Sequence, residues 1–523
     1  MPAWIQQFHT AGNEAIDPAT GLLTPFITND QSSLIVSILS AGTFFGALSA
    51  APAGDLLGRR FGLVLSNAIF CVGVILQTAS ADIPVFVAGR FFAGFGVGQL
   101  SALVPLYQSE TAPKWIRGVI VGAYQLAITI GLLLAAIVDN ATKGRSDSGA
   151  YRIPIAVQFA WAIILVAGLL ILPETPRYLI KTGKMDKAAR ALSRLRRLDI
   201  GHPAIASELQ EIVANHEYEL SFGQSSYIDC FKGGMFKRLA TGCLLQSLQQ
   251  LTGKFEFLPS RSYCSRLTSG AGVNFIFYYG TSYFTNAGFT NPFITTMITS
   301  AVNVASTFPG LYMVETWGRR NLLLFGGVGM CVCQFIVAIT GTVTAQDNQA
   351  AQNAAISFIC IYIFFFACSW GPVAWIVTGE IFPLKVRAKC LSMTTASNWL
   401  LNFAIAYATP YLVNNNPNQP PRGVDLKSKI FFIWGGCCFI CILFVWAMIY
   451  ETKGLSLEQV DELYDKVAVA WKSPGFKPTV SFQEVQDVNA GARKMSLVDA
   501  ESEAIRKKSV SHEEAVEPEK TWA

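Results

Sequence analysis

The stretch Asp55–Arg60 of this chain reads DLLGRR, and the stretch Glu315–Arg320 in its second half reads ETWGRR. A second pair follows in the same order. Glu110–Arg117 reads ETAPKWIR and Glu380–Arg387 reads EIFPLKVR, with the acid, the proline and the arginine equally spaced. One such pair is within the reach of chance, but two in the same order indicate an internal repeat. We therefore expect two similar halves joined by a central loop.

The composition indicates that lipid surrounds much of the chain. Of its 523 residues, 52% are hydrophobic and only 14% are charged, whereas soluble domains carry about 25% charged residues. The net charge of +5 comes from basic residues in loops and in the tail. This distribution fits the positive-inside rule better than binding to nucleic acid.

Membrane spans are predicted where an apolar run of roughly 20 residues can cross the hydrocarbon core. These runs lie near 31–54, 61–81, 84–108, 117–138, 153–172, 238–253 continuing at 273–288, 295–314, 321–342, 354–378, 390–411 and 429–450. The expected fold is an all-α membrane protein with about 11 visible spans. Its predicted parts are an N-terminal helix bundle (31–173), a cytoplasmic loop with short helices (174–236), a C-terminal helix bundle (237–450) and a cytoplasmic tail (451–523).

The repeat indicates that the first half lacks one span. Two predicted spans precede the Gly-Arg-Arg loop in the second half, but only one precedes it in the first half. Because no Lys or Arg occurs before Arg59, residues 1–30 are predicted to be an outside loop that follows a missing first helix. We expect Met1 to be an internal methionine of a longer natural product.

A charged block interrupts the span that starts near residue 238. Residues 254–272 contain Lys254, Glu256, Arg261 and Arg266, and charges in the middle of a span are costly. A genuine loop between two half-helices is one explanation, but a polar loop of this length needs a large aqueous cavity. We interpret the block as a suspected retained intron.

Further motifs accompany the repeat. They are GR at Gly89–Arg90, PETPR at Pro173–Arg177, QQLTG at Gln249–Gly253, VNF at Val273–Phe275, WGP at Trp370–Pro372 and ETKG at Glu451–Gly454. The whole set resembles that of the sugar porters of the major facilitator superfamily, especially the fungal monosaccharide (hexose) transporters. The resemblance implies a major facilitator fold of two six-helix bundles. The substrate would lie between the bundles at mid-membrane and be exposed alternately to each side.

Polar residues inside the predicted spans suit a neutral sugar. A primary amide offers both a donor and an acceptor without charge, which matches a sugar hydroxyl, and aromatic rings cover the apolar C–H faces. Hydrogen bonding between helices for structure alone is the other role that such residues take. The candidates for substrate binding are Gln125, Gln249, Gln250, Asn274, Asn303, Trp370, Asn398 and Trp399.

The resemblance implies finer roles for several of these residues. Sugar contact is implied most firmly for Gln125, Gln249, Gln250, Asn274 and Asn303. Trp370 and Trp399 resemble stacking and closing aromatics, and Tyr278 and Tyr279 match an outer gate. Trp375 is left between packing and gating.

Charged residues of the repeated loops form a second group of candidates. They fall at the predicted cytoplasmic ends of the spans, where ion pairs can latch the outward-facing state and break on opening. The resemblance implies the same role, and a topology signal alone is the alternative. The predicted cytoplasmic salt-bridge network comprises Asp55, Arg59, Arg60, Glu110, Arg117, Glu174, Arg177, Glu315, Arg319, Arg320, Glu380 and Arg387.

Two features lie inside the span at 84–108. Arg90 is a charge within the membrane, and such charges usually have a partner and a function. The resemblance implies that it works with an aspartate of the first helix in proton-coupled relatives, so proton coupling is left open. The string GFGVG at Gly94–Gly98 follows no strand, so we expect close helix packing there rather than nucleotide binding.

The expected function is transport of a monosaccharide, glucose or a related hexose, by alternating access, as a uniporter or a proton symporter. A carrier of quinate or another polyol and a transporter-like sugar sensor are the alternatives. The sequence has no phosphate-binding loop and no metal-ligand cluster, so neither an enzyme nor a cofactor is expected. We expect a monomer in the plasma membrane with a cytoplasmic C-terminus, partnered by sugar, by the lipid bilayer and, in a symporter, by protons.

Overall fold

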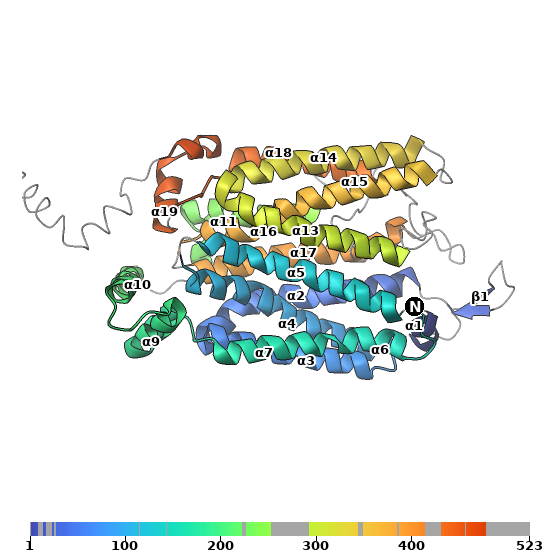
Figure 1. Ribbon diagram of the computed structural model, residues 1–523, viewed down its shortest axis with the longest axis horizontal. Coiled ribbons are helices and arrows are strands. Elements are labelled where there is room, and N and C mark those ends of the chain that lie inside the picture. The colour runs from blue at the N-terminus through green and yellow to red at the C-terminus, as the bar shows by residue number, and fades with distance from the viewer. Residues whose placement is uncertain are drawn as a thin grey trace, which may run out of the picture.

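The computed structural model describes most of the chain, and Figure 1 draws the remainder in grey. The described residues are 2–8, 14–16, 23–25, 28–113, 116–142, 144–221, 226–252, 292–343, 349–383, 386–413, 430–455 and 457–476. Long helices dominate them and lie side by side along one direction (Figure 1). The all-α fold class is therefore confirmed, apart from two short strands near the N-terminus.

The first half begins with a short helix and a two-stranded antiparallel sheet, both within residues 1–30. Its long helices follow, and α2 starts with a capping box in which Thr28 and Gln31 bond reciprocally. The elements are α1 (Pro2–Phe8), β1 (Glu14–Ile16), β2 (Leu23–Pro25), α2 (Asn29–Leu57), α3 (Arg59–Ala79), α4 (Ile83–Thr111), α5 (Arg117–Thr142), α6 (Gly149–Ala156) and α7 (Gln158–Ile171).

Short helices connect this half to the second one. They are α8 (Pro176–Lys181), α9 (Met185–Arg196), α10 (Pro203–Ser221) and the 3-10 helix η2 (Tyr227–Phe231). The second half comprises α11 (Gly233–Leu251), α13 (Pro292–Trp317), α14 (Arg319–Val343), α15 (Gln349–Cys368), α16 (Trp370–Glu380), α17 (Arg387–Val413), α18 (Ile430–Met448), α19 (Leu457–Lys466) and η4 (Ala470–Gly475).

The two halves lie one above the other in Figure 1, with α2 to α7 below and α13 to α18 above. The connecting helices α9 and α10 lie beyond the left end of the long helices, as does α19. We call this end of the molecule the linker end. The opposite end carries α1 and β1 (Figure 1). The halves meet mainly where α2 packs along α17 and α5 packs along α13, and α16 and α17 also contact α5 and α4.

The outward side chains of the bundle are apolar, as a lipid environment requires. Helix α7 shows this clearly, because Ile163, Ile164, Leu170 and Ile171 are 60–68% exposed. Among the described residues, eight helices are long and apolar enough to cross a membrane. They are Asp30–Leu57, Arg59–Ala79, Ile83–Thr111, Arg117–Thr142, Gly149–Ile171, Arg319–Val343, Asn353–Glu380 and Phe431–Met448.

Several sequence predictions remain untested by this structure. The count of eleven spans, the missing first helix and the proposed boundaries of the halves stay predictions. The suspected intron at 254–272 lies outside the described residues, and so do Asn274, Tyr278 and Tyr279.

Glycines hold α2 and α4 in close contact. A Cβ atom on Gly94 would lie 2.1 Å from the Leu39 carbonyl oxygen, and one on Gly98 would lie 2.1 Å from the Thr43 carbonyl oxygen. The contact is reciprocal, because a Cβ on Gly46 would lie 2.1 Å from the Phe95 oxygen. The expected packing role of the glycine string at 94–98 is thus confirmed.

This contact predicts a large difference between two glycine substitutions. Gly98→Ala should force α2 and α4 apart and cost about 1–3 kcal/mol of stability. Gly131→Ala, on α5 where a Cβ meets nothing within 4 Å, should be neutral or stabilise by up to about 1 kcal/mol, because alanine favours helix. Thermal unfolding of both variants in detergent measures the difference, and equal midpoints would contradict the close contact.

Candidate functional site

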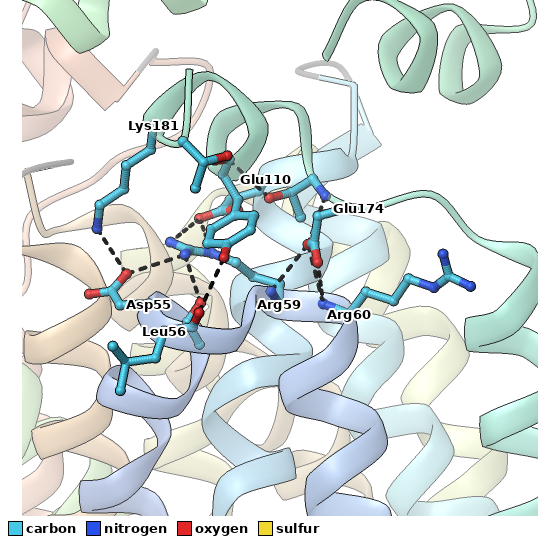
Figure 2. Close-up of polar contacts among 11 residues, drawn as sticks. Asp55, Leu56, Arg59, Arg60, Glu110, Glu174 and Lys181 are labelled. Carbon is cyan, nitrogen blue, oxygen red and sulfur yellow. Dashed lines mark hydrogen bonds and ion pairs between the residues drawn. The ribbon is translucent and has the colours of Figure 1, made fainter. Parts of the chain in front are cut away.

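A buried arginine organises the linker end of the first half (Figure 2). The Arg59 guanidinium donates to Asp55 Oδ1 at 3.2 Å and to Glu110 Oε1 at 3.2 and 3.3 Å. It also donates to the Gly54 carbonyl oxygen at 3.1 Å. Lys181 of α8 pairs with the same Asp55 oxygen at 3.0 Å. Because charges this deep need partners, α2, α3, α4 and α8 are tied together at one point. We call this set the first arginine cluster.

A carboxylate caps the helix that carries this arginine. Helix α3 starts directly after Gly58, so its first N–H groups have no partner within the helix. The backbone N–H groups of Arg59 and Arg60 donate to the Glu174 carboxylate at 3.0–3.2 Å, where negative charge also suits the helix dipole. Burial raises the pKa of the Glu174 carboxyl above its ordinary value, although hydrogen bonds from the Thr175 and Arg60 backbones oppose that rise.

The second half repeats this construction. The Arg319 guanidinium donates to Glu315 Oε2 at 3.1 Å and to Glu380 Oε1 at 2.9 Å. The backbone N–H groups of Arg319 and Arg320 donate to the Glu451 carboxylate at 2.9 and 3.1 Å, which caps α14 as Glu174 caps α3. We call this set the second arginine cluster.

Glycine is required before each of these capped helices. Gly58 and Gly318 have φ angles of 90° and 89°, a region that disfavours other residues. A Cβ on Gly58 would lie 2.6 Å from Glu174 Oε2, and one on Gly318 would lie 2.5 Å from Glu451 Oε2. The repeated glycine therefore serves both the turn and the carboxylate.

The structure distributes the predicted network unevenly. It joins Asp55, Arg59 and Glu110, and separately Glu315, Arg319 and Glu380, as ion pairs. The guanidinium groups of Arg60, Arg320 and Arg387 instead donate to carbonyl oxygens of Leu169 and Leu170, of Trp446, and of Phe382. Within the described chain no ion pair is found for Arg177. Arg117 begins α5, directly before Gly118.

Sequence reasoning missed Glu451 as a member of the second cluster. The signal was present, because Glu174-Thr175 and Glu451-Thr452 form a third repeated pair. Thr452 Oγ1 also donates to Glu380 Oε2 at 2.6 Å.

A group of buried amides lies in the second half. Asn398 of α17 donates to Gln249 Oε1 at 2.9 Å and to Gln246 Oε1 at 2.7 Å, and its Oδ1 accepts from Gln250 Nε2 at 3.0 Å. Gln246, Gln249 and Gln250 share one face of α11, because residues three and four apart are neighbours on a helix. Gln246 was not predicted, although its spacing from Gln249 and Gln250 would have placed it there. We call these four residues the amide cluster.

The amide cluster reaches the interface between the halves at Gly371. Gln249 Nε2 donates to the carbonyl oxygens of Trp370 and Gly371 at 2.9 and 3.0 Å, where α15 gives way to α16. From the first half, Gln125 of α5 approaches the same point. Its Cγ and Nε2 atoms lie 3.3 Å from where a Cβ on Gly371 would be. The amides of Gln125 and Gln249 thus meet the same glycine from opposite halves.

Aromatic side chains cross the same interface. The Trp375 ring of α16 packs edge-on against Tyr124 of α5, with centroids 5.1 Å apart. Trp399 Nε1 of α17 donates to Ser101 Oγ of α4 at 3.1 Å. Trp370, by contrast, is fully buried in the second half and donates to the Leu323 carbonyl oxygen at 3.0 Å.

Two predicted residues stand apart from the amide cluster. Asn303 of α13 is 1% exposed, and its Oδ1 has no hydrogen-bond partner among the described residues. Arg90 of α4 places its guanidinium carbon 5.9 Å from the centroid of the Phe86 ring.

The arrangement suits an uncharged ligand with many hydroxyl groups. Amides of both halves supply donors and acceptors, and indole and phenol rings flank them. In the part of the chain that the structure describes, no group of three or more His, Cys, Asp or Glu side chains is placed to hold a metal ion.

Comparison with known proteins identifies the family. The family model described as "Sugar (and other) transporter" matches residues 5–258 and 263–464. The chain is 60% identical over 91% of its length to the major facilitator-type transporter ecdD of Aspergillus rugulosus, covering 85% of that protein. It is 53% identical over 89% of its length to the probable glucose transporter rco-3 of Neurospora crassa, covering 75%. The high glucose sensor RGT2 of Saccharomyces cerevisiae is 42% identical over 84% of this chain, which spans 55% of the sensor.

A solved structure shares the fold. The proton:xylose symporter XylE bound to 6-bromo-6-deoxy-D-glucose matches with a TM-score of 0.69 and 25% identity, over 83% of this chain and 90% of that chain. The repeated arginine clusters, the amides between the halves and these similarities agree, and the chain belongs to the sugar transporter family of the major facilitator superfamily.

Proposed function

We propose that this protein transports a monosaccharide, glucose or a related hexose, across a membrane by alternating access. The observation that carries the proposal is the meeting of Gln125 and Gln249 at Gly371, from opposite halves of the molecule. A ligand bound between these amides would contact both halves at once. Rocking of the halves would then expose it first to one side and then to the other. No covalent bond is made or broken in this cycle.

The halves are in contact on the linker side of the amides. A Cβ on Gly118 of α5 would lie 2.1 Å from Glu315 Oε1, so the start of α5 rests against the second arginine cluster. One turn further, a Cβ on Gly122 would lie 2.5 Å from Leu311 Cδ2 of α13. These contacts support an assignment of the structure to a state that is closed at the linker end.

The orientation in the membrane is part of the proposal. Basic residues are frequent in α8 and α9 at the linker end, which favours a cytoplasmic position for that end and for α19. We infer a plasma-membrane carrier that works as a monomer. Uptake that responds to external pH would support coupling to protons through Arg90, and uptake indifferent to pH would support a uniporter.

A sugar sensor is the second candidate, because RGT2 is 42% identical to this chain. The same amides would bind sugar without carrying it across. The chain spans 55% of that sensor. A carrier of quinate or another polyol remains the alternative within transport, and the absence of a cation among the amide-cluster residues weighs against an acid.

Uptake of labelled glucose by a host that lacks its own hexose carriers tests the function. We expect uptake by the full chain, and we expect Gln125→Ala to reduce it about tenfold at low sugar concentration, because about one hydrogen bond to sugar is lost. Asn321→Ala, which removes an exposed amide bonded within its own turn, should leave uptake unchanged. Binding without uptake would favour the sensor, and uptake of quinate without glucose would favour the acid carrier.

The glycine before α14 offers a sharp test of the carboxylate cap. Gly318→Ala and Gly454→Ala both place alanine at a positive φ, 89° and 74°, but only the first collides with Glu451. Strain at a positive φ is of order 1–3 kcal/mol at each glycine, so a further loss in Gly318→Ala reports the carboxylate contact.

We therefore expect Gly318→Ala to lower both the unfolding temperature and glucose uptake clearly more than Gly454→Ala does. Equal effects of the two substitutions on both quantities would show that the Glu451 carboxylate at the start of α14 is not required for stability or uptake.

A further inference from the structure

Helix α2 contains a proline whose consequence reaches the other half of the molecule. Pro52 lies inside Asn29–Leu57 and has no backbone N–H. The carbonyl of Leu48, four residues earlier, therefore loses the donor that an ordinary helix would supply. Leu48 lies nine residues before the end of α2, which is about 14 Å from the linker end of the helix.

Hydroxyl groups from outside the first half reach this carbonyl. Ser392 Oγ of α17 donates toward the Leu48 oxygen at 3.3 Å and also to the neighbouring Ala47 oxygen. Tyr227 of η2 places its hydroxyl 3.5 Å from the Leu48 oxygen. Ser392 is completely buried, and Tyr227 is half-buried.

The tyrosine is itself held against α17. The Lys389 ammonium nitrogen lies 5.7 Å from the centroid of the Tyr227 ring. Three segments thus converge on the two carbonyls: α2 of the first half, α17 of the second half, and η2 at the end of the connecting chain.

This contact differs from the arginine clusters in what it joins. Arg59 pairs with Asp55 and Glu110 of its own half, and Arg319 pairs with Glu315 and Glu380 of its own half. Those ion pairs persist if the halves separate as rigid bodies. The Ser392 and Tyr227 contacts with α2 cannot persist, because their donors and acceptors belong to different moving parts.

We propose that the Leu48 carbonyl freed by Pro52 and the neighbouring Ala47 carbonyl are the acceptors of a latch between the halves, with Tyr227 and Ser392 as their donors. The latch stabilises the state that is closed at the linker end. Opening exchanges these hydrogen bonds for bonds to water, so closure regains the modest net stabilisation that each of them contributes. The inference rests on the proposed function only in assuming that the halves separate at this end.

Labelling of an introduced cysteine measures the opening without any sugar. Ala50 of α2 is 1% exposed and packs in one apolar cluster with Leu391 of α17, so Ala50→Cys reacts with a water-soluble maleimide only when the linker end opens. The full chain is reconstituted in lipid with and without Ala50→Cys. The difference between the two maleimide labelling rates is the labelling rate of the introduced cysteine.

We expect Ser392→Ala and Tyr227→Phe each to raise the labelling rate about threefold to tenfold, the equivalent of one lost hydrogen bond. Pro52→Ala restores the helical donor to Leu48, so it should also raise the rate, and Tyr227→Phe should add nothing in that background.

Ser66→Ala removes an equally buried hydroxyl whose partners, Gly62 and Gln99, lie in its own half. It should leave the labelling rate unchanged even where it lowers the unfolding temperature.

Unchanged labelling in Ser392→Ala and Tyr227→Phe would overturn the latch, as would a full effect of Tyr227→Phe in the Pro52→Ala background. Glucose uptake by the unmodified chain is measured separately. If the chain takes up no glucose but the labelling rates change as expected, the proposed function is rejected and the latch is kept. If the chain takes up glucose but the substitutions leave the labelling rate unchanged, the latch is rejected and the proposed function is kept.

Discussion

The hydrocarbon core of a bilayer offers no hydrogen bonds, so each buried polar group of this protein must find its partner within the chain. The arginine clusters satisfy this constraint inside each half, through Asp55 and Glu110 or through Glu315 and Glu380. Because their partners lie in the same half, each half can move as a unit without breaking them. Rigid halves are what a rocking carrier needs.

The same constraint acts differently between the halves. There neutral amides, an indole and hydroxyls meet, such as Gln125 at Gly371 and Trp399 at Ser101, and Glu315 packs on Gly118 while it keeps its own partner Arg319. Neutral hydrogen bonds contribute modestly and can be exchanged for bonds to a ligand or to water. A cleft of charged groups would resist such exchange, because an unpaired buried charge is far more costly. The division between these ion pairs within the halves and the neutral hydrogen bonds described between them is therefore consistent with transport of an uncharged substrate.

The sequence predicted the parts of this design that repeat or that follow helical spacing. The DLLGRR and ETWGRR stretches located Arg59 and Arg319, and GFGVG located the close contact of α2 with α4. The sequence pattern could not separate the roles of Arg59 and Arg60. Adjacent residues point in different directions from a helix, and the pattern does not show which of the two directions faces the carboxylates. The donors to the Leu48 carbonyl could not be predicted either. The sequence shows that Pro52 removes a backbone donor, but it does not show which side chain replaces that donor.

Binding of an uncharged sugar between the halves at Gly371 should be visible in a cryo-electron microscopy map of the full chain with glucose, in lipid nanodiscs. We expect sugar density in contact with the amides of both Gln125 and Gln249. Sugar density confined to one half, or a Gln125 side chain turned toward the acyl chains, would contradict it.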